Sequence, residues 1–206
     1  MISTADSGQP TAGIRRVLLL SVVGCLLSAV LSCHHSSDLP RLFEVPNARL
    51  IAETGKPVDL AANRGYVTVY DFIFTNCAAS CPVMTGALRR ITAKVPKDAK
   101  VRFVSISVDP TRDTPAVLAE YAKKVRNDDR WTFLTGDRDA IVKLSVDGFK
   151  LAAGGTPQPQ PGAEPLLHSS KFAIADKDGW IREYCDSNDD NTVDHVAATV
   201  KDLVRE

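Results

Sequence analysis

The stretch Asp71-Phe-Ile-Phe-Thr-Asn-Cys77-Ala-Ala-Ser-Cys81-Pro82 decides most of the fold. The apolar, β-branched and aromatic run Val67–Phe74 predicts a strand, and the segment after Cys81-Pro82 has the periodicity of a helix. Both cysteines therefore lie where a strand gives way to a helix N-terminus, whose dipole and free N–H groups favour a thiolate. A pair in this place can serve redox chemistry, metal binding or both.

Strands and helices alternate outward from this stretch. Strands are predicted at residues 48–52, 58–60, 67–74, 101–108, 131–135, 171–175 and 180–184, and helices at 82–94, 115–125, 137–146 and 192–203. Thr114 and Thr192 are predicted N-caps of the second and last of these helices. Residues 176–179 form a hairpin turn, and the Gly-, Pro- and Gln-rich residues 154–165 are expected to form a mobile loop.

This order of elements predicts an α/β fold with a central mixed sheet flanked by helices. The first long strand, a thiol pair, a helix, further strands, a hairpin and a terminal helix follow the order of a thioredoxin-like domain. We find no internal repeat and no second domain. We expect residues 1–32 to be a signal peptide or membrane anchor, 33–47 a tether and 48–206 the folded domain.

The N-terminal segment predicts export. Arg15-Arg16 precede an apolar run, residues 17–31, which is shorter than the roughly 20 residues of a typical membrane span. Val30-Leu31-Ser32-Cys33 resembles the lipobox of bacterial lipoproteins, which implies lipidation of Cys33. The alternative is an uncleaved anchor helix. Both interpretations place the domain on the outer, periplasmic side of a membrane.

The composition gives no support for a nucleic-acid partner or for a disulfide framework. The 206 residues carry 25 Lys and Arg against 25 Asp and Glu, so no net charge favours nucleic acid. Of five cysteines, Cys25 and Cys33 belong to the N-terminal segment. Export permits disulfides, but one pair and Cys185 do not form a disulfide framework in a domain of this size.

The spacing of Cys77 and Cys81 leaves their chemistry open. Positions i and i+4 share one face of a helix, so the two sulfurs can approach if Cys81 lies in the first turn. That geometry permits a disulfide, and it equally permits both sulfurs to hold one metal ion. The pattern C-x3-C alone is a weak signal.

Asp71 is a second candidate, because a carboxylate inside so apolar a strand is costly without a partner or a role. It stands six residues before Cys77, about where thioredoxins have a buried aspartate that moves protons at the thiols. We therefore consider Asp71 a candidate proton relay with a raised pKa. The alternative is a hydrogen-bonded structural aspartate.

Three ordered motifs resemble the Sco/SenC family. They are Phe74-Thr-Asn-Cys77 with Cys81-Pro82, then Ser105-Ile-Ser-Val-Asp109-Pro-Thr-Arg-Asp-Thr-Pro115, then His168-Ser-Ser-Lys-Phe-Ala-Ile-Ala-Asp176. The resemblance covers residues 48–205. It implies a thioredoxin-like fold, one bound copper ion, and assembly of the dinuclear copper centre of a respiratory cytochrome oxidase. The implied ligands are Cys77, Cys81 and His168.

The chemistry of these residues agrees with that ligand set. Thiolate sulfur selects soft ions such as Cu(I), and imidazole suits Cu(I) and Cu(II) alike. Three ligands leave coordination open, as a carrier requires, whereas structural zinc takes four protein ligands. The expected partners are the copper-accepting oxidase subunit, thiol–disulfide partners and the membrane.

Two other functions compete with the copper chaperone. A thiol–disulfide oxidoreductase would use Cys77 and Cys81 to reduce the cysteines of a copper-accepting partner. A thiol peroxidase is disfavoured, because Phe74 stands where peroxiredoxins have a threonine. Asp109 is a candidate neighbour of the metal, and Asp109 and Asp113 are expected to organise backbone N–H groups near the site. Packing is expected for Met84, and no role is assigned to Cys185 or His195.

Overall fold

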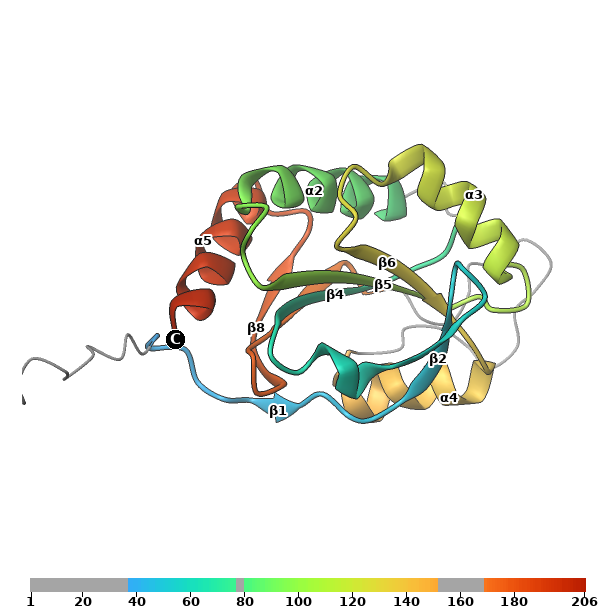
Figure 1. The fold of residues 1–206 in the computed structure, drawn as a ribbon, viewed down its shortest axis with the longest axis horizontal. Coiled ribbons are helices and arrows are strands. Elements are labelled where there is room, and N and C mark those ends of the chain that lie inside the picture. The colour runs from blue at the N-terminus through green and yellow to red at the C-terminus, as the bar shows by residue number, and fades with distance from the viewer. Residues whose placement is uncertain (1–36, 77–79, 152–168) are drawn as a thin grey trace, which may run out of the picture. The chain divides into compact units, whose positions relative to one another are not determined.

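The computed structural model describes residues 37–76, 80–151 and 169–206, and Figure 1 shows their arrangement. The strands are β1 Phe43–Glu44, β2 Arg49–Ala52, β3 Pro57–Asp59, β4 Val67–Ile73, β5 Val101–Ser107, β6 Trp131–Thr135, β7 Lys171–Ala175 and β8 Trp180–Asp186. The α-helices are α2 Ser80–Lys94, α3 Pro115–Val125, α4 Arg138–Lys143 and α5 Thr192–Arg205.

The strands form one mixed sheet in the order β1-β8-β7-β4-β5-β6-β2-β3. β4, β5 and β6 are parallel, and the remaining pairs are antiparallel. All seven residues of β4 are buried, as expected for a central strand covered on both faces. The predicted α/β class with a central mixed sheet is thus confirmed, together with the hairpin and terminal helix that end it.

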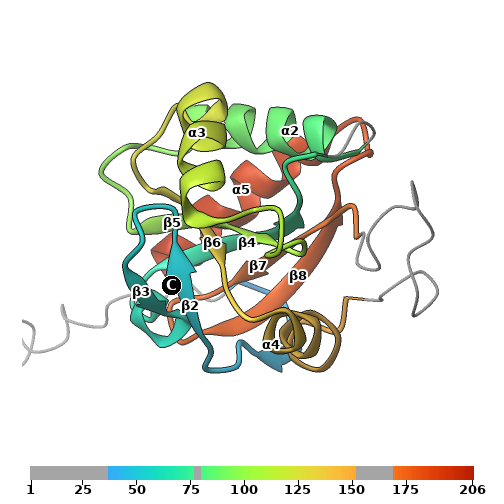
Figure 2. The same ribbon diagram turned by 90° about the vertical axis from the view of Figure 1, so that its right-hand side faces the viewer.

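Helices cover both faces of this sheet. α2 and α3 lie on one face and α4 on the other (Figure 2), and α5 packs against α2 and β4. Tyr70 and Phe72 contact the ring of Phe149, which follows α4, at centroid distances of 5.0 and 5.3 Å. Because side chains alternate along a strand, Asp71 faces the opposite layer, the one that contains α2.

The segment expected to be a tether differs from that expectation in its described part. From Ser37 onward the chain runs along the domain, and β1 pairs with β8. Its anchor is the buried side chain of Arg182, which donates hydrogen bonds to Ser37 Oγ and to the carbonyls of Leu39 and Pro40. A two-residue strand in a polar, aperiodic segment leaves no periodicity from which to predict it.

Three local predictions also differ from the structure. Thr192 is the first residue of α5 rather than its N-cap, because its hydroxyl donates to the carbonyl of Asp186. The predicted helix 137–146 is the short α4 with Asp137 as N-cap, and a π-helical turn continues it over Leu144–Gly148. A 3₁₀ turn at Leu60–Asn63 was not predicted.

Candidate functional site

The structure describes only some of the predicted site residues. Cys81 and Asp71 lie in described elements, α2 and β4. Cys77, His168 and Cys33 lie outside the described residues, as does the predicted loop 154–165. The approach of Cys77 and His168 to Cys81 therefore stays a prediction.

Cys81 is the second residue of α2 and is only 1% exposed. Its Sγ accepts a hydrogen bond from the backbone N–H of Phe74 at 3.5 Å. The sulfur therefore lies in the first turn of a helix, as expected, where free N–H groups and the helix dipole favour a thiolate. Pro82 fits the same turn, because the N–H groups of the first helical turn have no intrahelical acceptor and a proline there breaks no hydrogen bond.

Asp113 fixes the chain just before Cys77. Its carboxylate accepts hydrogen bonds from the Thr75 N–H at 3.0 Å, the Thr75 hydroxyl at 2.5 Å and the Ser107 hydroxyl at 2.6 Å. Asp113 is almost fully buried, so these bonds lie in a medium where losing one is costly. The expectation that this acidic segment organises N–H groups near the site is confirmed for Asp113.

Asp109 has a different role from Asp113. Its carboxylate pairs with Arg112, its carbonyl accepts the N–H groups of Arg112 and Asp113, and its own N–H donates to the Ser107 hydroxyl at 3.1 Å. These contacts fold the Asp109–Pro115 segment into a compact turn. Asp109 thus contacts Asp113 and Ser107, and no contact between Asp109 and Cys81 is found among the described residues.

Asp71 is fully buried in the middle of β4. Neither carboxylate oxygen has a hydrogen-bond partner within the described ranges. Burial raises the pKa of Asp71 to about 7, and the neighbouring Ser105 opposes this rise only in part. The carboxyl group thus changes its protonation state near neutral pH, as a proton relay must.

The neighbours of Asp71 keep its side of the sheet apolar. Asp71 is in register with Ser105 of β5, and the Ser105 hydroxyl accepts a hydrogen bond from Trp131 Nε1 at 2.8 Å. Trp131 stacks on Phe133, and both rings are completely buried. Ser105 accepts the indole N–H through its oxygen and keeps its own O–H available as a donor, so it offsets part of the rise in the pKa of Asp71 that burial causes.

Sequence reasoning missed several parts of this framework. Ser107, Ser105 and the Phe74 N–H gave no signal of their own, although Ser105 and Ser107 belong to the second motif. Their two-residue spacing places both on the face of β5 that Asp71 shares, and this could have found them. Met84 is fully buried in the core, in agreement with a packing role.

Cys185 and His195 form a separate group. Cys185 lies on β8 and is buried, and burial raises the pKa of its thiol to about 12. The group gathers around Glu183, whose carboxylate lies 2.7 Å from His195 Nε2. No local pattern connects these residues, because Glu183 and Cys185 lie on β8 and His195 lies on α5.

Comparison with known proteins places the chain in a family. A model of the SCO1/SenC family matches residues 44–205. A SCO1/SenC family lipoprotein from Bacillus anthracis is 27% identical, with a TM-score of 0.73 over 82% of this chain and 99% of that one.

Two further structures are similar over most of the chain. BsSco, described as a Sco-family cytochrome c oxidase assembly protein with a disulfide switch, is 29% identical with a TM-score of 0.69, covering 82% of this chain and 97% of that one. ScoI from Bradyrhizobium japonicum with copper bound is 27% identical with a TM-score of 0.64, covering 78% and 98%. Together with the motifs around Cys81 and Asp113, the family match over most of the domain shows that this chain belongs to the SCO1/SenC family.

Proposed function

We propose that this protein is a copper metallochaperone that holds one copper ion through Cys77, Cys81 and His168. It delivers the ion to the copper-accepting subunit of a respiratory cytochrome oxidase. The observation that carries the proposal is the position of Cys81, a buried thiol in the first turn of α2 whose sulfur accepts the Phe74 N–H. The helix N-terminus and the Phe74 N–H stabilise the thiolate form of Cys81, which a soft metal ion requires.

The donor set fits a carrier of copper. Two thiolates and one imidazole suit Cu(I), and three ligands leave a position open for a ligand of the recipient. The Asp113 anchor at Thr75 supports one side of the site, because it fixes the backbone two residues before Cys77. Transfer of the copper ion by stepwise ligand exchange requires that one side of the site is held rigidly and that a ligand of the recipient can reach the other side.

The proposed location is the outer face of a membrane, with Cys33 as a lipidated N-terminus. Its support is the export-like pattern of residues 15–33 and a similar protein described as a SCO1/SenC family lipoprotein. Within the described ranges, no helix is both long and apolar enough to cross a bilayer. The partner is proposed from the description of BsSco as an oxidase assembly protein.

Copper titration of the reduced full-length protein in detergent tests the proposal. We expect one tightly bound Cu(I) per chain in the wild type and a loss of at least about tenfold in affinity in His168→Ala. The matched control is His35→Ala, which removes a histidine of the expected tether outside the proposed ligand set and should retain the copper of the wild type at one equivalent. Equal affinity in the wild type and His168→Ala would overturn the ligand assignment.

A second candidate function, thiol–disulfide exchange, is favoured by the buried, unpartnered Asp71. In that reaction the Cys77 thiolate attacks a partner disulfide and forms a mixed disulfide, and the first partner sulfur leaves as a thiolate. Cys81 then attacks Cys77, so the partner gains two electrons and the pair becomes a disulfide. Asp71, with a pKa of about 7 and its side chain on the α2 side of the sheet, is the proposed acceptor of the proton of the second thiol.

Thiol reactivity distinguishes the two functions. If exchange uses Asp71, the pH profile of alkylation of the Cys77–Cys81 pair in Asp71→Asn should lose the ionisation near pH 7 that the wild type has. Identical profiles would remove Asp71 from the mechanism. Reduction of a disulfide peptide by His168→Ala at the wild-type rate, with copper binding lost, would show that the two activities need different residues.

A further inference from the structure

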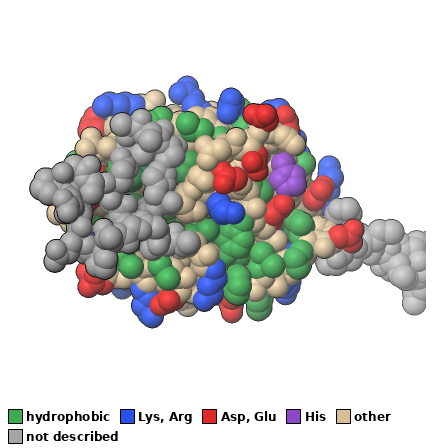
Figure 3. Space-filling view, turned by 180° about the vertical axis from the view of Figure 1, so that it is seen from behind, with side chains coloured by type: hydrophobic (Ala, Val, Ile, Leu, Met, Phe, Trp, Pro, Cys, Tyr) green, Lys and Arg blue, Asp and Glu red, His purple; other side chains and the backbone are tan. Residues whose placement is uncertain are grey.

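β8 and α5 bring a carboxylate, a thiol and an imidazole together. Glu183 and Cys185 are two residues apart on β8 and therefore point to the same side of the sheet. α5 packs against β8, and its first turn carries His195. Figure 3 shows the corresponding face, with a histidine at the surface among acidic side chains.

The three side chains are within reach of a single ion. His195 Nε2 lies 2.7 Å from Glu183 Oε1, and one ligand atom each from Glu183, Cys185 and His195 lies within 4.8 Å of the other two. Tetrahedral zinc, with bonds of about 2.0–2.3 Å, holds its ligand atoms about 3.3–3.6 Å apart. The cluster therefore needs shifts of an ångström or so, and the His195 side chain, 53% exposed, is free to make them.

The surroundings orient the carboxylate. The Thr199 hydroxyl, one helical turn after His195, donates to Glu183 Oε2 at 3.0 Å and leaves Oε1 toward the imidazole. Hydrogen bonds of this kind fix the orientation of metal ligands in known sites. Cys185 lies beneath the other two ligands and is buried, so the site has a closed inner side and an open outer side.

We propose that Glu183, Cys185 and His195 form a second metal site that takes a divalent borderline ion such as Zn²⁺. Sulfur excludes hard ions such as Ca²⁺ and Mg²⁺, whereas the thiolate, imidazole and carboxylate together are ligands that zinc takes. Binding replaces the thiol proton of Cys185, which leaves to solvent, and water fills the fourth position. No electron transfer is involved.

The site is separate from the proposed copper site. Asp194, next to His195, pairs with Lys94 at the C-terminal end of α2. Cys81 lies in the first turn of the same helix, and a helix of this length spans about 20 Å. Figure 1 likewise shows that α5 begins beside the end of α2 that is remote from Cys81. A metal here would join β8 to α5.

Zinc binding to the full-length protein with Cys77→Ser and Cys81→Ser tests the proposal, because those changes remove the other thiols of the domain. We expect one equivalent of Zn²⁺ in competition with a chromophoric chelator. His195→Gln and Cys185→Ser should each weaken binding at least about tenfold, and Thr199→Val by about tenfold through Glu183. The matched control is Asp194→Asn, which removes an exposed carboxylate beside the site and should leave the affinity unchanged.

Co²⁺ supplies a readout that a simple ion pair would not give. With Co²⁺ as the probe, a thiolate-to-metal charge-transfer band is expected in the near ultraviolet, and it should vanish in Cys185→Ser. Cys185→Ala replaces that variant if the serine does not fold. Absence of stoichiometric Zn²⁺ binding, or binding insensitive to both His195→Gln and the Cys185 variant, would overturn the proposal.

Discussion

Asp71 is a carboxylic acid placed where its ionised form is poorly solvated. It is fully buried, none of the described residues gives it a hydrogen bond, and burial raises its pKa to about 7 from an ordinary 3.8. Between these two values the native protein retains a proton that the unfolded chain releases. The free energy of unfolding therefore falls as the pH rises from 3.8 to about 7. Above pH 7, where the group is charged in both states, the full loss of stability has been reached.

This leads to a pH-dependent prediction for Asp71→Asn. The amide has the size of the protonated acid and does not ionise, so the free energies of unfolding of variant and wild type should be close at pH 4. From pH 4 to pH 8 the wild type should lose a few kcal/mol of stability relative to the variant, since one pKa unit corresponds to about 1.4 kcal/mol. Urea denaturation at several pH values measures this. A difference that does not change with pH would contradict it.

At the scale of elements, the loop between β4 and α2 is held by the segment between β5 and α3. Asp113 accepts three hydrogen bonds from Thr75 and Ser107, and Phe74 donates to Cys81. Thus both ends of the described part of this loop are tied, one to the second motif and one to α2. The second motif of the family is, in this chain, a support for the cysteine loop.

Asp113→Ala should therefore weaken copper binding without touching a ligand. The Thr75 N–H and the Ser107 hydroxyl would lose their acceptor in a buried place, which costs about 1–3 kcal/mol per group. We expect a lower stability and roughly tenfold weaker Cu(I) binding, measured by competition with a Cu(I) chelator.

The control for Asp113→Ala is Asp137→Ala. Asp137 caps α4, where it accepts the Ala140 N–H at 2.9 Å, on the other face of the sheet. Removing the cap should cost about 1 kcal/mol of stability and leave the copper affinity unchanged. Equal losses of copper affinity in both variants would mean that Asp113 acts only through global stability.

The elements that the sequence predicted best are those with strong periodic patterns. β4, β5 and β6 lie within one or two residues of their predicted ranges, because short runs rich in β-branched and aromatic residues between turn residues have few alternatives. The helix at Pro115 was predicted by Thr114, which does cap it. At α5 the same reasoning about Thr192 was wrong, because a tertiary partner, the Asp186 carbonyl, takes its hydroxyl.

The candidate site could be predicted in part. Cys81 at the start of a helix and Asp71 in a buried strand follow from local pattern, and both are confirmed in place. The contacts of Asp113 with Thr75 and the meeting of Glu183 with His195 depend on tertiary packing between segments distant in sequence. No local pattern carries that information, and only the fold supplies it.

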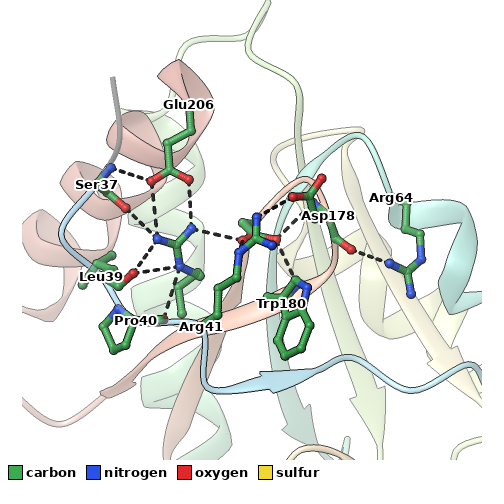
Figure 4. A network of polar contacts seen from close by, with 10 residues as sticks. Ser37, Leu39, Pro40, Arg41, Arg64, Asp178, Trp180 and Glu206 are labelled. Carbon is green, nitrogen blue, oxygen red and sulfur yellow. Dashed lines mark hydrogen bonds and ion pairs between the residues drawn. The ribbon is translucent and has the colours of Figure 1, made fainter. Parts of the chain in front are cut away.

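At the scale of the whole molecule, Arg182 joins the two ends of the described domain. Its guanidinium, 6% exposed, pairs with Asp176 at 3.0 Å and Glu206 at 2.8 Å, and it also donates to the carbonyls of residues 39 and 40. Figure 4 shows this network, in which Glu206 and Ser37 converge on one guanidinium. The start of the described chain is therefore attached to the C-terminal helix.

Arg182→Gln should release this attachment. Removing this buried charge takes the guanidinium away from both Asp176 and Glu206, and we expect a loss of about 3–5 kcal/mol. Hydrogen exchange in residues 37–45 should become faster, while the β4–β5 pair remains protected. Arg205→Gln is the control, because Arg205 is exposed and pairs with Asp202 on the same helix, and it should cost less than about 1 kcal/mol. Unchanged exchange in residues 37–45 would refute the attachment.

X-ray absorption of the reduced full-length protein with slightly less than one equivalent of Cu(I) identifies the ligands of copper. We expect two sulfurs and one imidazole nitrogen bound to the copper ion. In Cys81→Ser the ion should lose one sulfur, and in His168→Ala the imidazole scattering should disappear. The same set of ligands in the wild type, Cys81→Ser and His168→Ala would show that Cys81 and His168 do not bind the copper ion.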